Sequence, residues 1–160
     1  MSLKKKGQVI AISLLCIGLM LTLTVYTAAS VFTGAHSEKL TANTSGVAST
    51  SSLGVYSDSA CTKPLTSIQW GELSPGQSAT KQIYVKNTQS VLLVLRLSTN
   101  KWTPINANGP LTLTWNRQNT LLSPGQSIGA TITLTTSLNA TGISSFTVQI
   151  LLSGTSRSRL

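Results

Sequence analysis

Short runs in which apolar and polar residues alternate recur from residue 52 onwards, and they restrict the fold more than any other feature of the chain. Side chains of a β-strand point alternately to its two faces, so this spacing predicts strands with one buried and one solvated face. Turn-forming residues separate the runs, as is typical of an antiparallel sandwich. The runs are 53–56, 82–86, 93–97, 111–115, 131–135 and 146–150. The sequence therefore predicts an all-β sandwich of about seven or eight strands over residues 52–153.

A hexapeptide, Leu-Ser-Pro-Gly-Gln-Ser, occurs at 73–78 and again at 122–127, each time directly before an expected strand. Proline fixes φ at the second position of a turn and glycine accepts the positive φ that follows, so both copies predict a type II turn. Half of the residues would be too few for a separate core. The repeat therefore indicates two equivalent corners of one sandwich.

The stretch from Val55 to about Ile150 resembles the immunoglobulin-like surface modules of exported prokaryotic, and especially archaeal, proteins. Its Pro-Gly turn with an asparagine further along is also similar to the repeat of TasA-type biofilm fibre proteins and archaeal bundling pili. The resemblance implies a single immunoglobulin-like antiparallel β-sandwich, although the Cys…Trp…Cys spacing of antibody domains is missing. The motifs that carry it are Trp70–Gly76, Tyr84–Asn87, Asn100–Pro104, the second Pro-Gly turn and Thr141-Gly142.

The N-terminal residues differ in character from the rest of the chain. A basic leader, residues 1–7, contains three lysines, and no charged residue follows within 8–35. An apolar run of this length is enough to cross a bilayer, which takes about 20 residues. Because lysines stay on the cytoplasmic side, we expect a transmembrane-type helix at 8–35, with the later residues outside the cell.

Three routes of processing remain open for this segment. Gly7-Gln8, preceded by lysines and followed by the apolar run, resembles the cleavage site of archaeal type IV pilins and archaellins. The resemblance implies a cut between Gly7 and Gln8 that leaves the apolar helix on the mature subunit. Small residues at 27–29 and 33–35 suit cleavage as an ordinary secretory signal instead. Without cleavage, the segment would be a signal anchor.

Few residues suited to catalysis or metal binding are present. The chain has three carboxylates, Glu38, Asp58 and Glu72, and one histidine, His36. General acid–base catalysis and most metal sites use these residue types in close groups, whereas Asp58 has no second acid near it in the sequence. We therefore predict no enzyme activity, no catalytic or metal-binding residues and no cofactor.

The excess of basic residues, a formal net charge of +9, is spread singly beyond the leader. Proteins that bind nucleic acids cluster their basic residues and place aromatic residues among them, so no nucleic-acid partner is expected. The pattern favours a thinly charged solvated surface. Weak attraction to an acidic glycan of the cell envelope stays open.

Several single residues allow two interpretations. Trp70, Trp102 and Trp115 fit core or rim packing better than a carbohydrate-stacking platform. Cys16 and Cys61 lie on opposite sides of the expected membrane boundary, so they should not pair with each other. We expect Cys61 to be buried, and otherwise to pair between subunits.

Asn43 and Asn139 begin glycosylation sequons in segments expected to be exposed. Residues 36–51 are small and polar, which predicts either a tether or an extended first strand. Residues 154–160 are expected to form a flexible C-terminal tail.

Together, these features predict a non-enzymatic protein of the cell surface. An apolar helix followed by an immunoglobulin-like sandwich resembles archaeal pilins and archaellins, which implies a homo-oligomeric filament with the helices in its core. A variant is strand donation, in which residues 36–51 of one subunit complete the sheet of the next. The alternative is a monomeric membrane-anchored binding or adhesion module.

Overall fold

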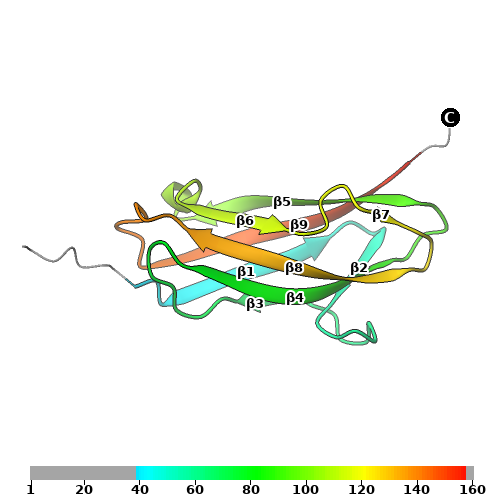
Figure 1. Ribbon diagram of the computed structural model, residues 1–160, viewed down its shortest axis with the longest axis horizontal. Coiled ribbons are helices and arrows are strands. Elements are labelled where there is room, and N and C mark those ends of the chain that lie inside the picture. Colours follow the sequence, from blue (N-terminus) through cyan, green and yellow to red (C-terminus); the bar gives the residue numbers. More distant parts are fainter. Residues whose placement is uncertain (1–38, 158–160) are drawn as a thin grey trace, which may run out of the picture. The chain divides into compact units, whose positions relative to one another are not determined.

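A computed structural model describes residues 39–157 of the chain (Figure 1). The predicted leader 1–7, the helix at 8–35 and the cleavage site at Gly7 and Gln8 lie outside these residues. Within them, no helix is long and apolar enough to cross a membrane.

The described chain forms two packed sheets, which confirms the predicted all-β sandwich. Its strands are β1 (Ala42–Ser49), β2 (Leu53–Tyr56), β3 (Ser67–Gln69), β4 (Ser78–Asn87), β5 (Leu93–Thr103), β6 (Leu111–Trp115), β7 (Leu121–Leu122), β8 (Ser127–Thr136) and β9 (Ser145–Ser156), with a short 3-10 helix, η1 (Ile105–Ala107). One sheet has five strands in the order β3-β1-β9-β5-β7, and the other has four in the order β2-β4-β8-β6. Figure 1 shows β4 and β8 in one layer and β1, β9 and β5 in the other.

The core between the sheets follows the alternation in the sequence. In β9, every second residue from Phe146 to Leu152 is buried, and β4 shows the same spacing at Ile83 and Val85. Burying such a side chain stabilises a fold by about 1.5–3 kcal/mol, so these positions are the main source of stability. Trp102 joins this core, with its ring centroid 5.9 Å from that of Phe146.

The first strand differs in direction from the predicted antiparallel arrangement. β1 lies between β3 and β9 and runs parallel to β9 over the eight residue pairs from Ala42–Ser145 to Ser49–Leu152. Hairpin turns specify antiparallel pairs, but β1 and β9 are far apart in sequence and share no turn. Leu40 is also fully buried, so the folded part includes residues before 52, and within the predicted tether or first strand at 36–51 the structure has a strand at Ala42–Ser49. At the other terminus, β9 continues into the predicted tail.

Polar side chains hold β1 in place. Asn43 and Ser45 are buried on its inner face. Asn43 Nδ2 donates to the carbonyl oxygens of Leu40 (3.0 Å) and Gly71 (2.8 Å). Trp70 Nε1 donates to Ser45 Oγ at 2.7 Å. Because buried polar groups are stable only when they are hydrogen-bonded, these bonds secure β1 against the segment that follows β3.

Both copies of the repeated hexapeptide form the predicted turn. Gly76 has a φ of 79° and Gly125 a φ of 68°, the positive values that a type II turn requires. In each copy the glutamine N–H donates to the carbonyl of the first serine at 3.1 Å. The glutamine side chain in turn accepts from that serine's N–H, at 3.0 Å in the first copy and 3.1 Å in the second. The turns lead into β4 and β8, which are antiparallel neighbours, so they lie at opposite ends of the sandwich.

Replacing either turn glycine with valine should destabilise the domain, because a β-branched side chain resists positive φ. We expect Gly125→Val to lower the free energy of unfolding by about 1–3 kcal/mol. Gly76→Val should cost at least as much, since a Cβ there would lie 2.6 Å from Leu138 Cδ2 and that side chain would have to move. Chemical denaturation of a fragment of residues 36–160 measures both effects.

Gly46→Val is the matched control. Gly46 lies in β1 and has open space around its Cβ position, and valine favours strands. The free energy of unfolding of the Gly46→Val fragment should equal or exceed that of the unchanged fragment. If both turn variants were as stable as the unchanged fragment, the type II assignment would be refuted.

Candidate functional site

The two carboxylates in the described residues lie in different loops. Asp58 belongs to the β2–β3 loop, and Glu72 belongs to the β3–β4 loop, where it forms an ion pair with Lys39. Both partners of that pair are largely exposed, so it contributes little to stability. Between residues 39 and 157, no three His, Cys, Asp or Glu side chains lie close enough together to hold a metal ion. The absence of enzyme activity stays a prediction from composition.

Asp58 organises the turn in which it lies. Its carboxylate accepts hydrogen bonds from Thr62 Oγ1 (2.7 Å), from the Thr62 N–H (3.1 Å) and from the Lys63 N–H (2.7 Å). These bonds, chiefly the one from the Thr62 side chain, hold the pKa of Asp58 below its usual value. A carboxylate whose acceptor positions are used in this way has a structural role.

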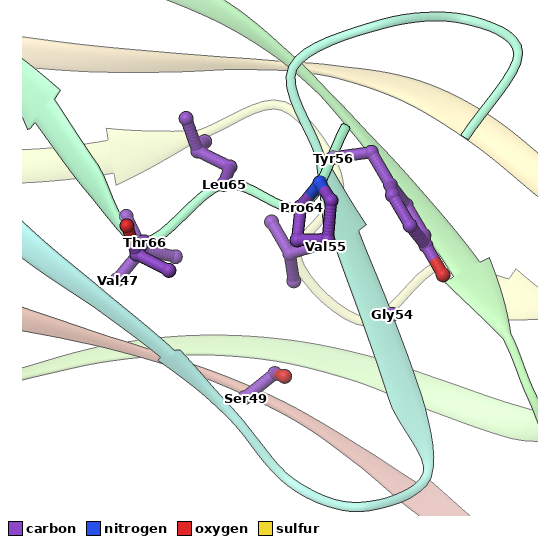
Figure 2. Close-up of a pocket in the computed structure, with 8 residues that line it drawn as sticks. All are labelled: Val47, Ser49, Gly54, Val55, Tyr56, Pro64, Leu65 and Thr66. Carbon is purple, nitrogen blue, oxygen red and sulfur yellow. The ribbon is translucent and has the colours of Figure 1, made fainter. Parts of the chain in front are cut away.

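A hollow of about 280 Å³ opens between β1 and β2, beside the segment that crosses from one sheet to the other. Leu65 N–H donates to the Val55 carbonyl at 2.9 Å on the β2 side. On the β1 side, Val47 N–H donates to the Thr66 carbonyl at 2.8 Å. Figure 2 shows the Tyr56 ring on the other side of Val55 from Leu65 and Thr66. The lining residues, none of them charged, are Val47, Ser49, Gly54, Val55, Tyr56, Pro64, Leu65 and Thr66.

A second groove of about 280 Å³ lies between β3 and the first half of β4. β2 pairs with β4 only from Tyr84 to Asn87, so in the described part of the chain no strand covers that edge of residues 78–83. Open strand edges invite pairing with other chains, and an inward-pointing charge is one feature that prevents it. Lys81 lies on the same face of β4 as the buried Ile83 and lines this groove, so it disfavours such pairing.

The three tryptophans are core residues, as the packing interpretation predicts. All three side chains are buried, and each indole N–H has a partner within the domain. Trp102 Nε1 donates to Thr99 Oγ1 at 3.3 Å, and Trp115 Nε1 donates to Gln118 Oε1 at 2.8 Å. Buried rings present no platform on which a sugar could stack.

The two sequons differ in accessibility. Asn43 is only 3% exposed, and its Nδ2, the atom that would carry a glycan, already donates two hydrogen bonds to backbone carbonyls. The expected exposure of Asn43 is therefore wrong, because β1 is an inner strand, and the folded chain has no room for a glycan there. Asn139 lies exposed in the β8–β9 loop, where glycosylation stays a prediction.

Cys61 is partly exposed in the β2–β3 loop, so its expected burial is wrong. The turn organised by Asp58 projects from the sandwich, and Cys61 adopts a φ of 54° within it. Pairing of Cys61 between subunits stays a prediction.

Two exposed apolar side chains have no counterpart among the predicted site residues. Ile105 in η1 is 77% exposed, and Leu138 in the β8–β9 loop is 80% exposed. Each is a single large apolar residue among small, polar and turn-forming residues. This isolation is the sequence feature by which the two exposed residues could have been identified. Val91 and Leu121 are less exposed, at 46% and 44%.

No known protein family matches the chain, and no curated protein sequence matches it. The fold and its surface define the class: an all-β sandwich in which, between residues 39 and 157, no three His, Cys, Asp or Glu side chains are grouped.

The shortage of carboxylates predicts resistance to acid. Carboxylates with a lowered folded-state pKa stabilise a protein above their unfolded pKa, and this stability is lost as the pH falls through the folded pKa. Asp58 is such a group, but it lies partly exposed in a loop outside the core. We expect circular dichroism of residues 36–160 to retain the β signal down to about pH 2.

The local effect of Asp58 can be separated from global unfolding. The Lys63 amide should lose protection from hydrogen exchange as the pH falls through the lowered pKa of Asp58, while the core strands remain protected. Asp58→Ala should remove the same protection already at neutral pH. A cooperative loss of β signal between about pH 5 and pH 3 would instead mean that Asp58 or Glu72 stabilises the whole domain.

Proposed function

We propose that this chain is a non-enzymatic structural protein of the cell surface, a subunit of a pilus-like filament that assembles through its apolar N-terminal segment. The segment 8–35 is long enough to enter a membrane or a filament core, and the sandwich that follows is presented outside the cell. The observation that carries the proposal is the position of β1, the first strand after this segment.

β1 is the strand through which tension from the N-terminal segment reaches the sandwich. It is an inner strand, bonded to β3 on one side and to β9 on the other. β1 begins at one end of the sandwich and β9 finishes at the other (Figure 1). Tension between the termini therefore acts along the paired strands, so that their eight residue pairs resist it together rather than one after another. This geometry suits a subunit under mechanical load.

The order of the strands supports an immunoglobulin-like architecture. Constant-type immunoglobulin sandwiches have one sheet in the order A-B-E-D and one in the order C-F-G. Here β2-β4-β8-β6 corresponds to the first and β5-β9-β1 to the second, with β3 and β7 added as short edges. The last position, G, is occupied by the first strand of the chain, which is parallel to its neighbour.

This arrangement favours strand donation as a second mode of assembly. β1 takes its place in the sheet although it comes first in the chain, and only residues 50–52 join it to β2. The same strand from a neighbouring subunit would find identical partners, so subunits exchanging β1 would form an open chain.

The other candidate function is a monomeric membrane-anchored adhesion module. It is favoured by the two uncharged or weakly charged grooves and by the scattered basic residues, which suit envelope glycans.

The mature N-terminus tests the filament proposal. Mass spectrometry of the surface protein should find Gln8 as the first residue, because a pilin-type peptidase cuts after Gly7 and leaves the apolar segment in place. Gly7→Val should block this maturation and the appearance of filaments. A chain that begins at Met1 would indicate an anchor instead, and one that begins near residues 30–36 would indicate strand donation or simple secretion.

A designed disulfide separates helix-driven assembly from strand donation. Ala48 and Leu151 lie opposite each other on the outer face of β1 and β9, a geometry that a disulfide can bridge. With Cys16 and Cys61 replaced by serine, oxidised filaments of Ala48→Cys/Leu151→Cys should give single subunits on a non-reducing gel. A covalent ladder of subunits would mean that β1 is exchanged. Ala48→Cys/Thr147→Cys is the control that should not link, because the two positions are about 13 Å out of register.

A further inference from the structure

One end of the sandwich carries the two most exposed large apolar side chains of the described residues, Ile105 and Leu138. We call this end, formed by residues 70–77, 104–110 and 137–144, the N-terminal end, because β1 begins there (Figure 1). Val91 and Leu121 lie in segments at the opposite end, and both are about half as exposed.

Backbone contacts connect Leu138 to the point where the chain enters the sandwich. Leu40 N–H donates to the Leu73 carbonyl at 2.8 Å, and Leu73 N–H donates back to the Leu40 carbonyl at 3.1 Å. The turn that follows Leu73 lies under Leu138, since a Cβ on Gly76 would be 2.6 Å from Leu138 Cδ2. Leu138 is therefore held close to the first buried residue of the domain.

Ile105 belongs to the same end. Ser137 N–H donates to the Pro110 carbonyl at 2.7 Å, which joins the loop of Leu138 to the loop of Ile105. The two apolar side chains thus belong to adjacent loops that each cross between the two sheets, since β5 and β6 flank Ile105 while β8 and β9 flank Leu138.

The length of chain before Leu40 restricts how far this end can lie from a membrane that holds residues 8–35. Residues 36–39 separate the apolar segment from Leu40, and the steps from residue 35 to Leu40 span at most about 18 Å. The headgroup region of one leaflet is itself about 5–8 Å thick. A fully extended tether therefore leaves at most about 10–13 Å between Leu40 and the outer edge of the headgroups, so the N-terminal end is the part of the domain that can reach them.

Charge at this end is compatible with an anionic surface. Glu72 is neutralised by its ion pair with Lys39. Lys101, near the end of β5, has no ion-pair partner between residues 39 and 157. Single exposed apolar residues are ordinary on protein surfaces, so exposure alone would indicate nothing. Here the exposed pair and the short tether occur at the same end, and among residues 39–157 no unpaired carboxylate lies there.

We infer that the N-terminal end of the sandwich rests on the lipid surface of the membrane that holds residues 8–35, with Ile105 and Leu138 inserted among the headgroups. This inference rests on the proposed membrane attachment of the chain before assembly. It orients the domain: β1 runs away from the bilayer, and the end that carries Val91 and Leu121 faces outwards. A glycan on Asn139, next to Leu138, would prevent the contact, so glycosylation at that position would contradict the inference.

A fluorescent probe at Leu138 tests the contact in the full chain. Cys16 and Cys61 are replaced by serine, and an NBD fluorophore is attached at Leu138→Cys or, as the matched control at the opposite end, at Leu121→Cys. The chain is placed in vesicles of phosphatidylcholine and phosphatidylglycerol. We expect the probe at 138 to emit at a shorter wavelength than the probe at 121, to be quenched by nitroxide-labelled lipids, and to be several-fold less accessible to aqueous iodide. A probe at Ile105→Cys should behave like the probe at 138.

Each other outcome overturns the inference in a distinguishable way. A chain retained in the vesicles whose probes at 138 and 121 are equally accessible to iodide would refute the lipid contact but leave the membrane attachment intact. A probe at 138 that is shielded only at high protein-to-lipid ratio, without quenching by nitroxide lipids, would mean that a second copy covers this end. A chain recovered in the supernatant would refute the attachment itself, and the contact with it.

Discussion

The insertion of β1 between β3 and β9 is the constraint on which the rest of the structure depends. β3 has β1 as its strand partner, and β9 would become an edge of its sheet without it. The buried residues on the inner face of β1, Asn43 and Ser45, are polar, with Val47 partly buried beside them, so hydrogen bonds replace part of the apolar contacts found in other strands. Ser45 Oγ accepts a hydrogen bond from the indole N–H of Trp70. Asn43 Nδ2 donates to two backbone carbonyls near the start of the domain. Removing such a buried partner leaves the other group unsatisfied, which costs about 1–3 kcal/mol for each bond lost.

A second buried asparagine has the same task at the opposite end. Asn87, at the end of β4, is fully buried and donates from Nδ2 to the carbonyls of Val91 (2.8 Å) and Leu122 (3.0 Å), while its Oδ1 accepts from Gln89 N–H (2.8 Å). Each end of the sandwich is therefore secured by one amide side chain that bridges separate segments. The segments beyond these two residues are left free to carry surface features, such as Ile105 and Leu138 at one end and Val91 and Leu121 at the other.

The edges and the ends of the sandwich have different capacities for association. β2, β3 and β7 are short, and where β4 is left open Lys81 points to the inner side, both of which disfavour pairing between sheets of different molecules. The fourth edge strand, β6, is longer, with five residues. The end loops have no such protection. In the proposed assembly, contacts of the folded domain with a membrane or with neighbouring subunits would be made through its ends, in the direction along which β1 would carry tension, unless β1 itself is exchanged.

The sequence by itself determined the sandwich and its corners, because alternation and positive φ are local properties. The inward positions of β4 and β9 follow from period two, and Gly76 and Gly125 follow from the two Pro-Gly pairs. Only the tertiary structure decided the place of β1, because Asn43 becomes a core residue only when the distant carbonyl of Gly71 reaches it. The same holds for the apolar residues of the loops. Whether Ile105 or Leu138 is buried depends on what the fold brings next to it, and at the N-terminal end the described chain leaves both uncovered.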